Sequence, residues 1–403
     1  MGLREEADSE RTCGPLDGIR VLDLSRVIMG PLATQILADQ GADVIMLEAK
    51  DGDTNRVMGA GPHPELSGVA LNLLRNKRSV VVDFKTDEGM DLVHRLVATC
   101  DVVVATMRPQ VLTRLGLDYQ SLERHRPGLI YCQGQGFPLA SPRAEEPAYD
   151  DIIQAASGVC DVMTRVFDVP ALLPTIFADK ACALIIAQVV TAALFHRERT
   201  GQGQHVEVPM VQAIKAFMLV EHGSGAIAVN GDASTPYGGT GYVRVLSKER
   251  RAHPTADGVI HMQPYSPKHY AALFAAVGMD TASADHRYKD IRSTIQYSDE
   301  LYREVRAACA QRTTQEWLDF CEEAQIPATR VETLENMVDE LPVATHPVIG
   351  DFHLISQMAN FSATPGGLRR MAPMIGQDND EVVEELRQLE RTASAVNDVA
   401  ATS

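Results

Sequence analysis

Hydrophobic and polar positions alternate along the first half of the chain in a pattern that predicts strands and helices in turn. Short apolar runs rich in β-branched residues predict strands at 18–24, 43–48, 79–84, 101–105 and 129–133. Segments between them predict helices, including one from Gly30 to Leu37, with Pro31 in its first turn, and an amphipathic one over 86–98. Strands and helices that alternate at this spacing predict parallel βαβ units, and therefore a doubly wound, Rossmann-like α/β domain.

The longest apolar segment lies within 174–204 and has a single acid near its start. Asp179 precedes an apolar run from Ala181 to Phe195, which ends in cationic residues followed by Gly201. This pattern predicts a buried helix with Asp179 as its N-cap and Gly201 as its C-terminal stop. The run is too short and too interrupted to predict a membrane span. The pattern alone leaves Asp179 either a capping residue or a catalytic one.

The second half of the chain predicts a different kind of unit. Further strands are expected at 205–208, 259–262 and 325–331, and further helices at 209–220, 267–277, 299–310 and 314–324, the last capped by Thr314. From these elements we predict a disordered lead at 1–15, a large α/β domain at 16–225, a smaller α+β domain at 226–325, a return segment at 326–390 that completes the large domain, and a frayed tail at 391–403.

Composition and motifs exclude several classes of function. The chain of 403 residues has a formal net charge of −17 and a pI near 5.1, which argues against nucleic acids and anionic membranes as partners. Its twelve histidines show no H-E-x-x-H spacing, so no metal site is expected. No G-x-G-x-x-G follows the first strand and no Walker A motif occurs, so neither NAD nor ATP is expected. Seven cysteines without C-x-x-C spacing predict free thiols and a cytoplasmic location.

Basic residues gather at the ends of the predicted strands. Arg26, Lys50, Lys85 and Arg108 each follow one of the first four strands, and Arg75, Lys77, Arg78 and Arg114 lie nearby. In an acidic protein such residues predict a local pocket for a phosphorylated ligand. Each of them alone is better explained as the solvated end of a loop.

Several short motifs, taken together, resemble one family. They are L-D-G-I-R-V-L-D-L-S-R-V at 16–27, G-A-D-V-I-M-L-E at 41–48, N-K-R-S-V-V-V-D-F-K at 76–85, P-A-Y-D at 147–150, H-R-E-R-T-G-Q-G-Q-H-V-E-V at 196–208 and A-P-M-I-G at 372–376. In this order, and over nearly the whole chain, they resemble the class III coenzyme A transferases of the CaiB/BaiF type, which include formyl-CoA transferase and carnitine CoA-transferase.

The resemblance implies a mechanism and a set of roles. Asp179 falls at the position of the family's nucleophile, which forms an aspartyl anhydride and an aspartyl-CoA thioester. Gly238 and Gly239 fall in a glycine loop that covers it. Positions at or next to the family's coenzyme contacts, together with the strand-end residue Lys50, give the expected coenzyme-binding residues: Arg26, Val27, Ile28, Lys50, Lys85, Met107, Arg108, Arg114 and Tyr149. The implied co-substrates are an acyl-CoA donor and a carboxylic acid acceptor, without metal, NAD or ATP, and the implied assembly is an interlocked homodimer.

Two other functions stay open on this fold. The α-methylacyl-CoA racemases share the scaffold but carry a G-H-D motif, where this chain has Ala148-Tyr149-Asp150 and therefore lacks the histidine. A non-catalytic CoA-binding protein is the other alternative, since Lys180 directly follows Asp179. Ile28 stands where formyl-CoA transferase has a glutamine, so oxalate and formate are not the expected acids. Asp150 and Asp151 either cap the helix that they begin or line the pocket.

Overall fold

The computed structural model describes residues 14–230, 239–279 and 285–402, with the backbone alone for 393–402. The chain forms two compact units. The first contains the chain up to Gln154, Pro174–Ile214 and the chain from Leu341 onward, and the second contains Ala155–Leu173 and Lys215–Glu340. The second unit is therefore wider than the domain predicted at 226–325, and it includes a segment that precedes the long apolar helix.

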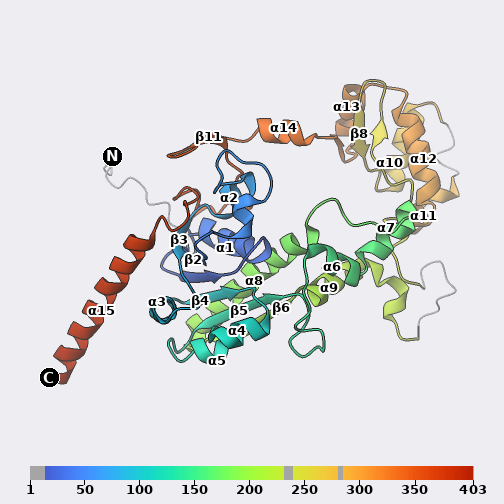
Figure 1. The fold of residues 1–403 in the computed structure, drawn as a ribbon. Helices are drawn as coiled ribbons and strands as arrows, with labels where there is room; N and C mark the ends of the chain where they lie inside the picture. Colours follow the sequence, from blue (N-terminus) through green and yellow to red (C-terminus); the bar gives the residue numbers. More distant parts are fainter. Residues whose placement is uncertain (1–13, 231–238, 280–284, 403) are drawn as a thin grey trace, which may run out of the picture. The chain divides into compact units, whose positions relative to one another are not determined.

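A parallel six-stranded sheet forms the centre of the first unit (Figure 1). Its strands lie in the order β3-β2-β1-β4-β5-β6 and are β1 (Arg20–Leu24), β2 (Asp43–Glu48), β3 (Lys77–Val81), β4 (Val102–Ala105), β5 (Ile130–Gln135) and β6 (Gln204–Pro209). This is the Rossmann order, in which the direction of winding reverses between β1 and β4. The predicted doubly wound α/β fold is confirmed for this unit.

The two faces of the sheet are buried by different helices. Leu22, Val103 and Tyr131 point to one face, where they form a core with helices α3 and α4 and with the C-terminal helix α15. On the other face α1 packs against α8, which also contacts β5 and β6. The helices and 3-10 turns that lie in or begin in this unit are α1 (Met29–Asp39), η1 (Thr54–Val57), α2 (Gly68–Leu73), α3 (Asp87–Thr99), α4 (Pro109–Leu115), α5 (Tyr119–Leu122), α6 (Asp150–Ala156), α8 (Phe177–Thr200), α9 (Met210–His222) and α15 (Asn379–Thr402).

The predicted strand at 79–84 is shifted in the structure. β3 runs from Lys77 to Val81, because its first two residues are cations that are buried in ion pairs. The ammonium of Lys77 donates to Asp23 Oδ2 at 3.0 Å, and Arg78 pairs with Asp43 at 2.5 Å. Arg75, close before the strand, pairs with Asp39 at 2.7 Å. These three cations are thus neither solvated loop ends nor part of a ligand pocket, and they hold the sheet to its flanking segments.

Helix α8 is the longest apolar element of the first unit. It ends as predicted, with Arg197 and Arg199 in its last turn and Gly201 as a C-cap at a φ of 73°. Within the described residues it alone is long and apolar enough to cross a membrane, a test that buried core helices also pass. The prediction that the apolar run at 181–195 is too short for a membrane span is therefore wrong, since it lies in a helix of 24 residues. Its contacts with α1, β5 and β6 are those of a core helix.

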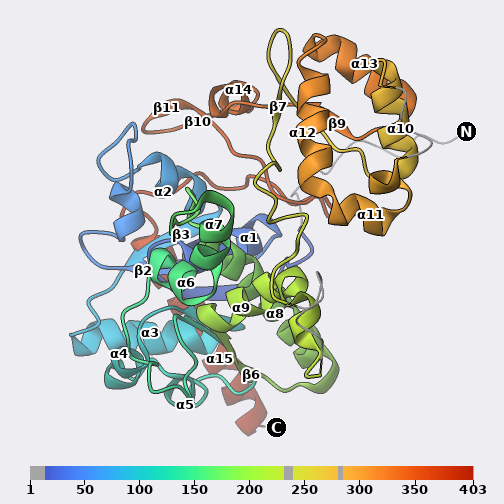
Figure 2. The ribbon, with the colours of Figure 1, turned by 90° about the vertical axis from the view of Figure 1, so that its right-hand side faces the viewer.

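The second unit is a small α+β body (Figure 2). Its antiparallel sheet has the order β7-β8-β9. Helices α10, α12 and α13 share a hydrophobic core with β8, and α11 lies against α12. Trp317 and Phe274 are fully buried in its core. Its elements are α7 (Val159–Phe167), η2 (Ser224–Ile227), β7 (His253–Pro254), β8 (Val259–Met262), α10 (Pro267–Ala276), η3 (His286–Tyr288), α11 (Ile291–Gln296), α12 (Ser298–Cys309), α13 (Thr314–Ala324), β9 (Ala328–Arg330) and α14 (Leu334–Asp339).

Two predictions in this region need correction. The strand expected at 325–331 is β9, but it pairs with β8 and so belongs to the small sheet instead of starting a return to the large one. Helix α13 is capped by Thr313, not Thr314, in a capping box with Glu316. The chain re-enters the first unit at Leu341, where β10 (Val343–His346) and β11 (Gly350–His353) form an antiparallel hairpin.

Candidate active site

A cavity of about 390 Å³ opens at the carboxyl ends of the central strands in the first unit. Its walls come from the loop after β1 with the start of α1, the loop after β4 with the start of α4, and the end of β5. These are the segments on either side of the point where the strand order reverses. Open α/β sheets bind their ligands at this point, so the cavity is the candidate site of this chain.

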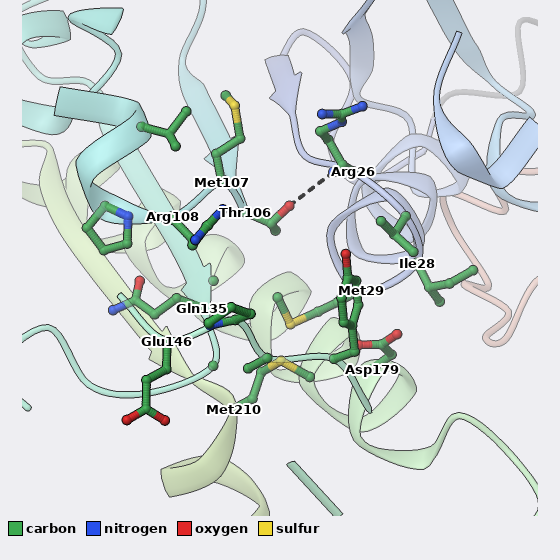
Figure 3. A pocket seen from close by; sticks show the side chains of 18 of the residues that line it. Arg26, Ile28, Met29, Thr106, Met107, Arg108, Gln135, Glu146, Asp179 and Met210 are labelled. Atoms are coloured by element: carbon green, nitrogen blue, oxygen red, sulfur yellow. Dashed lines mark hydrogen bonds between the residues drawn. The ribbon is translucent and has the colours of Figure 1, made fainter. Parts of the chain in front are cut away.

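Hydrogen bonds fix the loop that follows β1. The backbone N–H of Arg26 donates to Thr106 Oγ1 at 3.0 Å, which links the loops on the two sides of the switch point (Figure 3). Val27 has a φ of 69°, an unfavourable conformation for a β-branched residue. Its N–H donates to Asp53 Oδ1 at 3.0 Å and its carbonyl accepts from Asn55 Nδ2 at 3.3 Å. The surrounding structure therefore holds this loop in a strained shape.

Asp179 lies in the first turn of α8 and lines the cavity. The sequence pattern predicted Asp179 as the N-cap of this helix, and this is wrong, because α8 begins at Phe177 and its N-cap is Ile176. The carboxyl group therefore does not cap its own helix. Burial, and secondly the charge of Asp150, raise the pKa of Asp179 to about 7. A carboxyl group with this pKa is partly ionised at neutral pH and more basic than an ordinary aspartate.

The cavity is lined by both charged and apolar side chains. Figure 3 shows Asp179 on the side of Met29 and Met210, whereas Arg108 lies toward the opposite end. Directly after β5 there is no room for a side chain at position 136, since a Cβ on Gly136 would lie 2.2 Å from that of Ala148. An elongated ligand with an anionic part and an apolar part fits this distribution.

Seven of the residues that the sequence singles out line this cavity: Arg26, Val27, Ile28, Met107, Arg108, Tyr149 and Asp179. Lys50, Lys85 and Arg114 are exposed and do not line it. Their contact with a coenzyme stays a prediction. Gly238 lies outside the described residues. Gly239 is an exposed residue of the second unit, and its role above Asp179 likewise stays a prediction.

Sequence reasoning missed a buried polar side chain in the cavity wall. Gln135, on β5, donates through Nε2 to Glu207 Oε1 at 2.9 Å, while its own Oε1 is buried without a hydrogen-bond partner among the described residues. A buried, unpaired carbonyl oxygen in a cavity wall is suited to accept a hydrogen bond from a ligand. The sequence gives little signal for it, since Gln135 lies beyond the strand predicted at 129–133 and β5 contains a second glutamine, Gln133.

Fold and site together define an α/β protein with a cavity at the switch point of its sheet that is suited to an elongated, partly anionic ligand beside a basic carboxyl group. The family model for CoA-transferase family III matches residues 16–379, and the chain belongs to this family. It is thus an enzyme of the class III CoA-transferases, which use CoA thioesters as co-substrates. The resemblance of the short motifs is confirmed.

Individual relatives agree with this assignment. The chain is 30% identical over 395 residues to the succinate–glutarate CoA-transferase of Agrobacterium fabrum, a match that covers 94% of this chain and 98% of the relative. It is 33% identical over 339 residues to a probable fatty acyl-CoA transferase of Mycobacterium tuberculosis, covering 81% and 84%. The crystal structure of a CAIB/BAIF family protein from Brucella suis is 26% identical, with a TM-score of 0.76 over 93% of this chain and 100% of that one.

Proposed function

We propose that this chain transfers coenzyme A from an acyl-CoA thioester to a free carboxylic acid, with Asp179 as the nucleophile. The observation that carries the proposal is the carboxyl group of Asp179 in the switch-point cavity, with its pKa raised to about 7. A poorly hydrated carboxylate of high basicity is a better nucleophile toward a thioester carbonyl than a carboxylate in water.

The proposed reaction has four balanced steps. The Asp179 carboxylate attacks the acyl carbonyl, a C–O bond forms, the C–S bond breaks, and CoA thiolate leaves behind a mixed anhydride. The thiolate attacks the aspartyl carbonyl and releases the donor acid, which leaves an aspartyl-CoA thioester. The acceptor carboxylate attacks this thioester and again displaces the thiolate. The thiolate then attacks the acceptor carbonyl of the second anhydride, which yields the new acyl-CoA and regenerates Asp179.

The polarity of the cavity supports one orientation of the coenzyme. Arg26 and Arg108 provide cationic groups for the phosphates, because guanidinium groups bind phosphate oxygens through charge-assisted hydrogen bonds. The pantetheine arm would then extend toward Asp179. In this orientation the buried Oε1 of Gln135 is available to accept from one of its amide N–H groups. The acyl chain would meet Ile28, Met29 and Met210.

Water must be kept from the anhydride, which it would hydrolyse. We propose that Gly238 and Gly239 belong to a loop that covers Asp179 during the reaction, as the resemblance to the family implies. Glycine permits the close approach of backbone N–H groups, which are suited to stabilise the oxyanion of each tetrahedral intermediate.

The racemase alternative needs a histidine beside the aspartate. Among the described residues that line the cavity there is no histidine, and Tyr149 stands where the racemase motif has one. The non-catalytic alternative gives no reason for a carboxyl group whose pKa is raised by burial in the ligand cavity. Both observations favour the transferase.

The proposed function is tested by a transfer assay. The protein is incubated with succinyl-CoA, glutaryl-CoA or a fatty acyl-CoA and with a panel of acids, and new thioesters are identified by mass. We expect transfer for at least one pair and a loss of about 10⁴-fold or more in Asp179→Ala, since the nucleophile is then absent. Deuterium uptake at the alpha carbon of a branched acyl-CoA, without transfer, would instead establish a racemase.

We also propose that the enzyme is a homodimer. Large apolar side chains are exposed along 334–361, among them Leu334 at 76%, Val343 at 62% and Met358 at 65%. A soluble monomer rarely leaves so many such side chains in water within one segment. A second copy of this chain is the proposed cover.

A further inference from the structure

Helix α8 begins without a cap from its own sequence. Ile176 precedes it and has no side chain that can accept a hydrogen bond from the first turn. The N–H of Asp179 instead donates to Oδ1 of Asp150, the first residue of α6, at 3.0 Å. An acceptor from another helix therefore supplies what an N-cap residue normally supplies.

The second oxygen of the Asp150 carboxylate is also fixed. Gln154 Nε2 donates to Asp150 Oδ2 at 2.6 Å and to the carbonyl of Thr175, just before α8, at 3.3 Å. Asp150 is 5% exposed and Gln154 is fully buried. Among the described residues no lysine or arginine lies within ion-pair distance of Asp150, in contrast to the buried Asp23, which pairs with Lys77. The carboxylate of Asp150 is thus held in place without a cation to neutralise it.

We propose that Asp150 is a positioning residue, which holds the first turn of α8 and whose negative charge promotes nucleophilic attack by Asp179. This inference rests on the proposed transferase chemistry. Two carboxylates close together in a partly dry site repel each other. Acylation converts the Asp179 carboxylate into a neutral anhydride and later a neutral thioester, so the first covalent step relieves the repulsion, and it returns only when Asp179 is regenerated. Asp150 therefore raises the free energy of the reactant state relative to the intermediates.

Other titratable groups near Asp179 do not provide this effect. Burial raises the pKa of Cys182, one turn further along α8, to about 12, so this thiol is neutral. The ammonium of Lys180 bonds to Thr175 Oγ1 at 2.7 Å. The same cavity is lined by Arg26, Arg108, Glu146 and Tyr149, but none of these is among the causes that raise the pKa of Asp179. Burial and the charge of Asp150 are the two causes that raise the pKa of Asp179, and only the second can be removed without changing the cavity.

The test is Asp150→Asn, with Asp151→Asn as the matched control. Asparagine keeps a carbonyl oxygen for the N–H of Asp179 and removes the charge, and the exposed neighbour Asp151 loses the same charge at the next position. Two profiles are recorded for each protein. One is the pH dependence of kcat/KM, and the other is the pH dependence of carbodiimide modification of Asp179 without substrate, followed by peptide mass.

We expect both midpoints to move to lower pH by about one unit in Asp150→Asn, with kcat about tenfold lower above pH 8, while Asp151→Asn matches wild type. Equal midpoints in all three proteins would overturn the proposal. If Asp150→Asn does not fold, Asp150→Glu replaces it, and the charge it keeps must leave the modification midpoint near that of wild type. The modification profile needs no turnover, so a failure of the transferase proposal would show separately, as absent transfer in wild type.

Discussion

At the scale of single residues, the proposed reaction depends on the ionisation of Asp179. The pKa of this carboxyl group is raised to about 7, first by burial and then by the charge of Asp150. The nucleophile must be ionised, and protonation below the raised pKa removes it. We therefore predict that kcat/KM rises with pH, with a midpoint near 7, and is level above pH 8.

This pH dependence is checked by initial rates of transfer in overlapping buffers, with the non-enzymatic hydrolysis of the thioester measured in parallel. A profile that stays level from pH 5 to pH 8 would contradict a nucleophile with this pKa.

The sequence predicts some site residues well and others not at all. Motifs found Asp179 and the loop from Arg26 to Ile28, and the structure brings these together in one cavity. Gln135 was missed, and the role of Asp150 was left open between capping its helix and lining the pocket, because their roles arise from contacts with Glu207 and Asp179, which are distant in the chain. Spacing along the sequence does not encode such contacts.

At the scale of elements, the loop after β1 is held in a backbone conformation that is unfavourable for Val27. Asp53 Oδ1 accepts from the N–H of Val27 and from that of Asn55, both at 3.0 Å. Loss of this acceptor would let Val27 relax from its φ of 69° and move Arg26. We predict that Asp53→Ala weakens CoA binding by about tenfold, because a preorganised loop is lost.

The dissociation constants of wild type and Asp53→Ala for CoA are compared by calorimetric titration. Asp51→Ala is the matched control, since Asp51 is an exposed acid in the loop after β2, which also contains Asp53. Asp53→Asn keeps an oxygen acceptor and should restore most of the affinity. Equal dissociation constants for Asp53→Ala and Asp51→Ala would show that the loop does not need this contact.

Element boundaries were predicted best where hydrophobicity decides them. β2 and β8 have the predicted bounds, whereas β3 begins two residues early at Lys77. A strand that begins with buried Lys77 and Arg78 cannot be found from an apolar pattern, because ion pairs with Asp23 and Asp43 replace hydrophobic contacts there. The capping role predicted for Asp179 failed for a similar reason, since Asp150 on another helix accepts from its N–H.

At the scale of the whole molecule, the alternation of strands and helices predicted the large sheet but not the division of the chain. The segment Ala155–Leu173 belongs to the second unit, although it lies between two segments of the first. β9 belongs to the small sheet because it pairs with β8, whose residues are about 70 positions earlier in the chain. Such a division depends on contacts between distant segments, which the local pattern does not contain.

The proposed homodimer is a prediction at this scale. The apolar side chains exposed along 334–361 need a cover, so we expect a particle of twice the chain mass of 43.9 kDa by light scattering after size exclusion. Replacement of Leu334, Val343 and Met358 by Ser together should shift the protein toward the single-chain mass. A wild-type particle of 43.9 kDa at micromolar concentration would rule the dimer out.

The most direct test of the central claim is the mass of the peptide that contains Asp179 after reaction with an acyl-CoA. The protein is mixed with a competent donor without acceptor, quenched with hydroxylamine or borohydride, and digested. If Asp179 is the nucleophile, we expect a hydroxamate or a reduced side chain at this residue. The product should form only when the thioester is present and should be absent in Asp179→Ala. Transfer that proceeds with an unmodified Asp179, or with the adduct on another residue, would contradict Asp179 as the nucleophile.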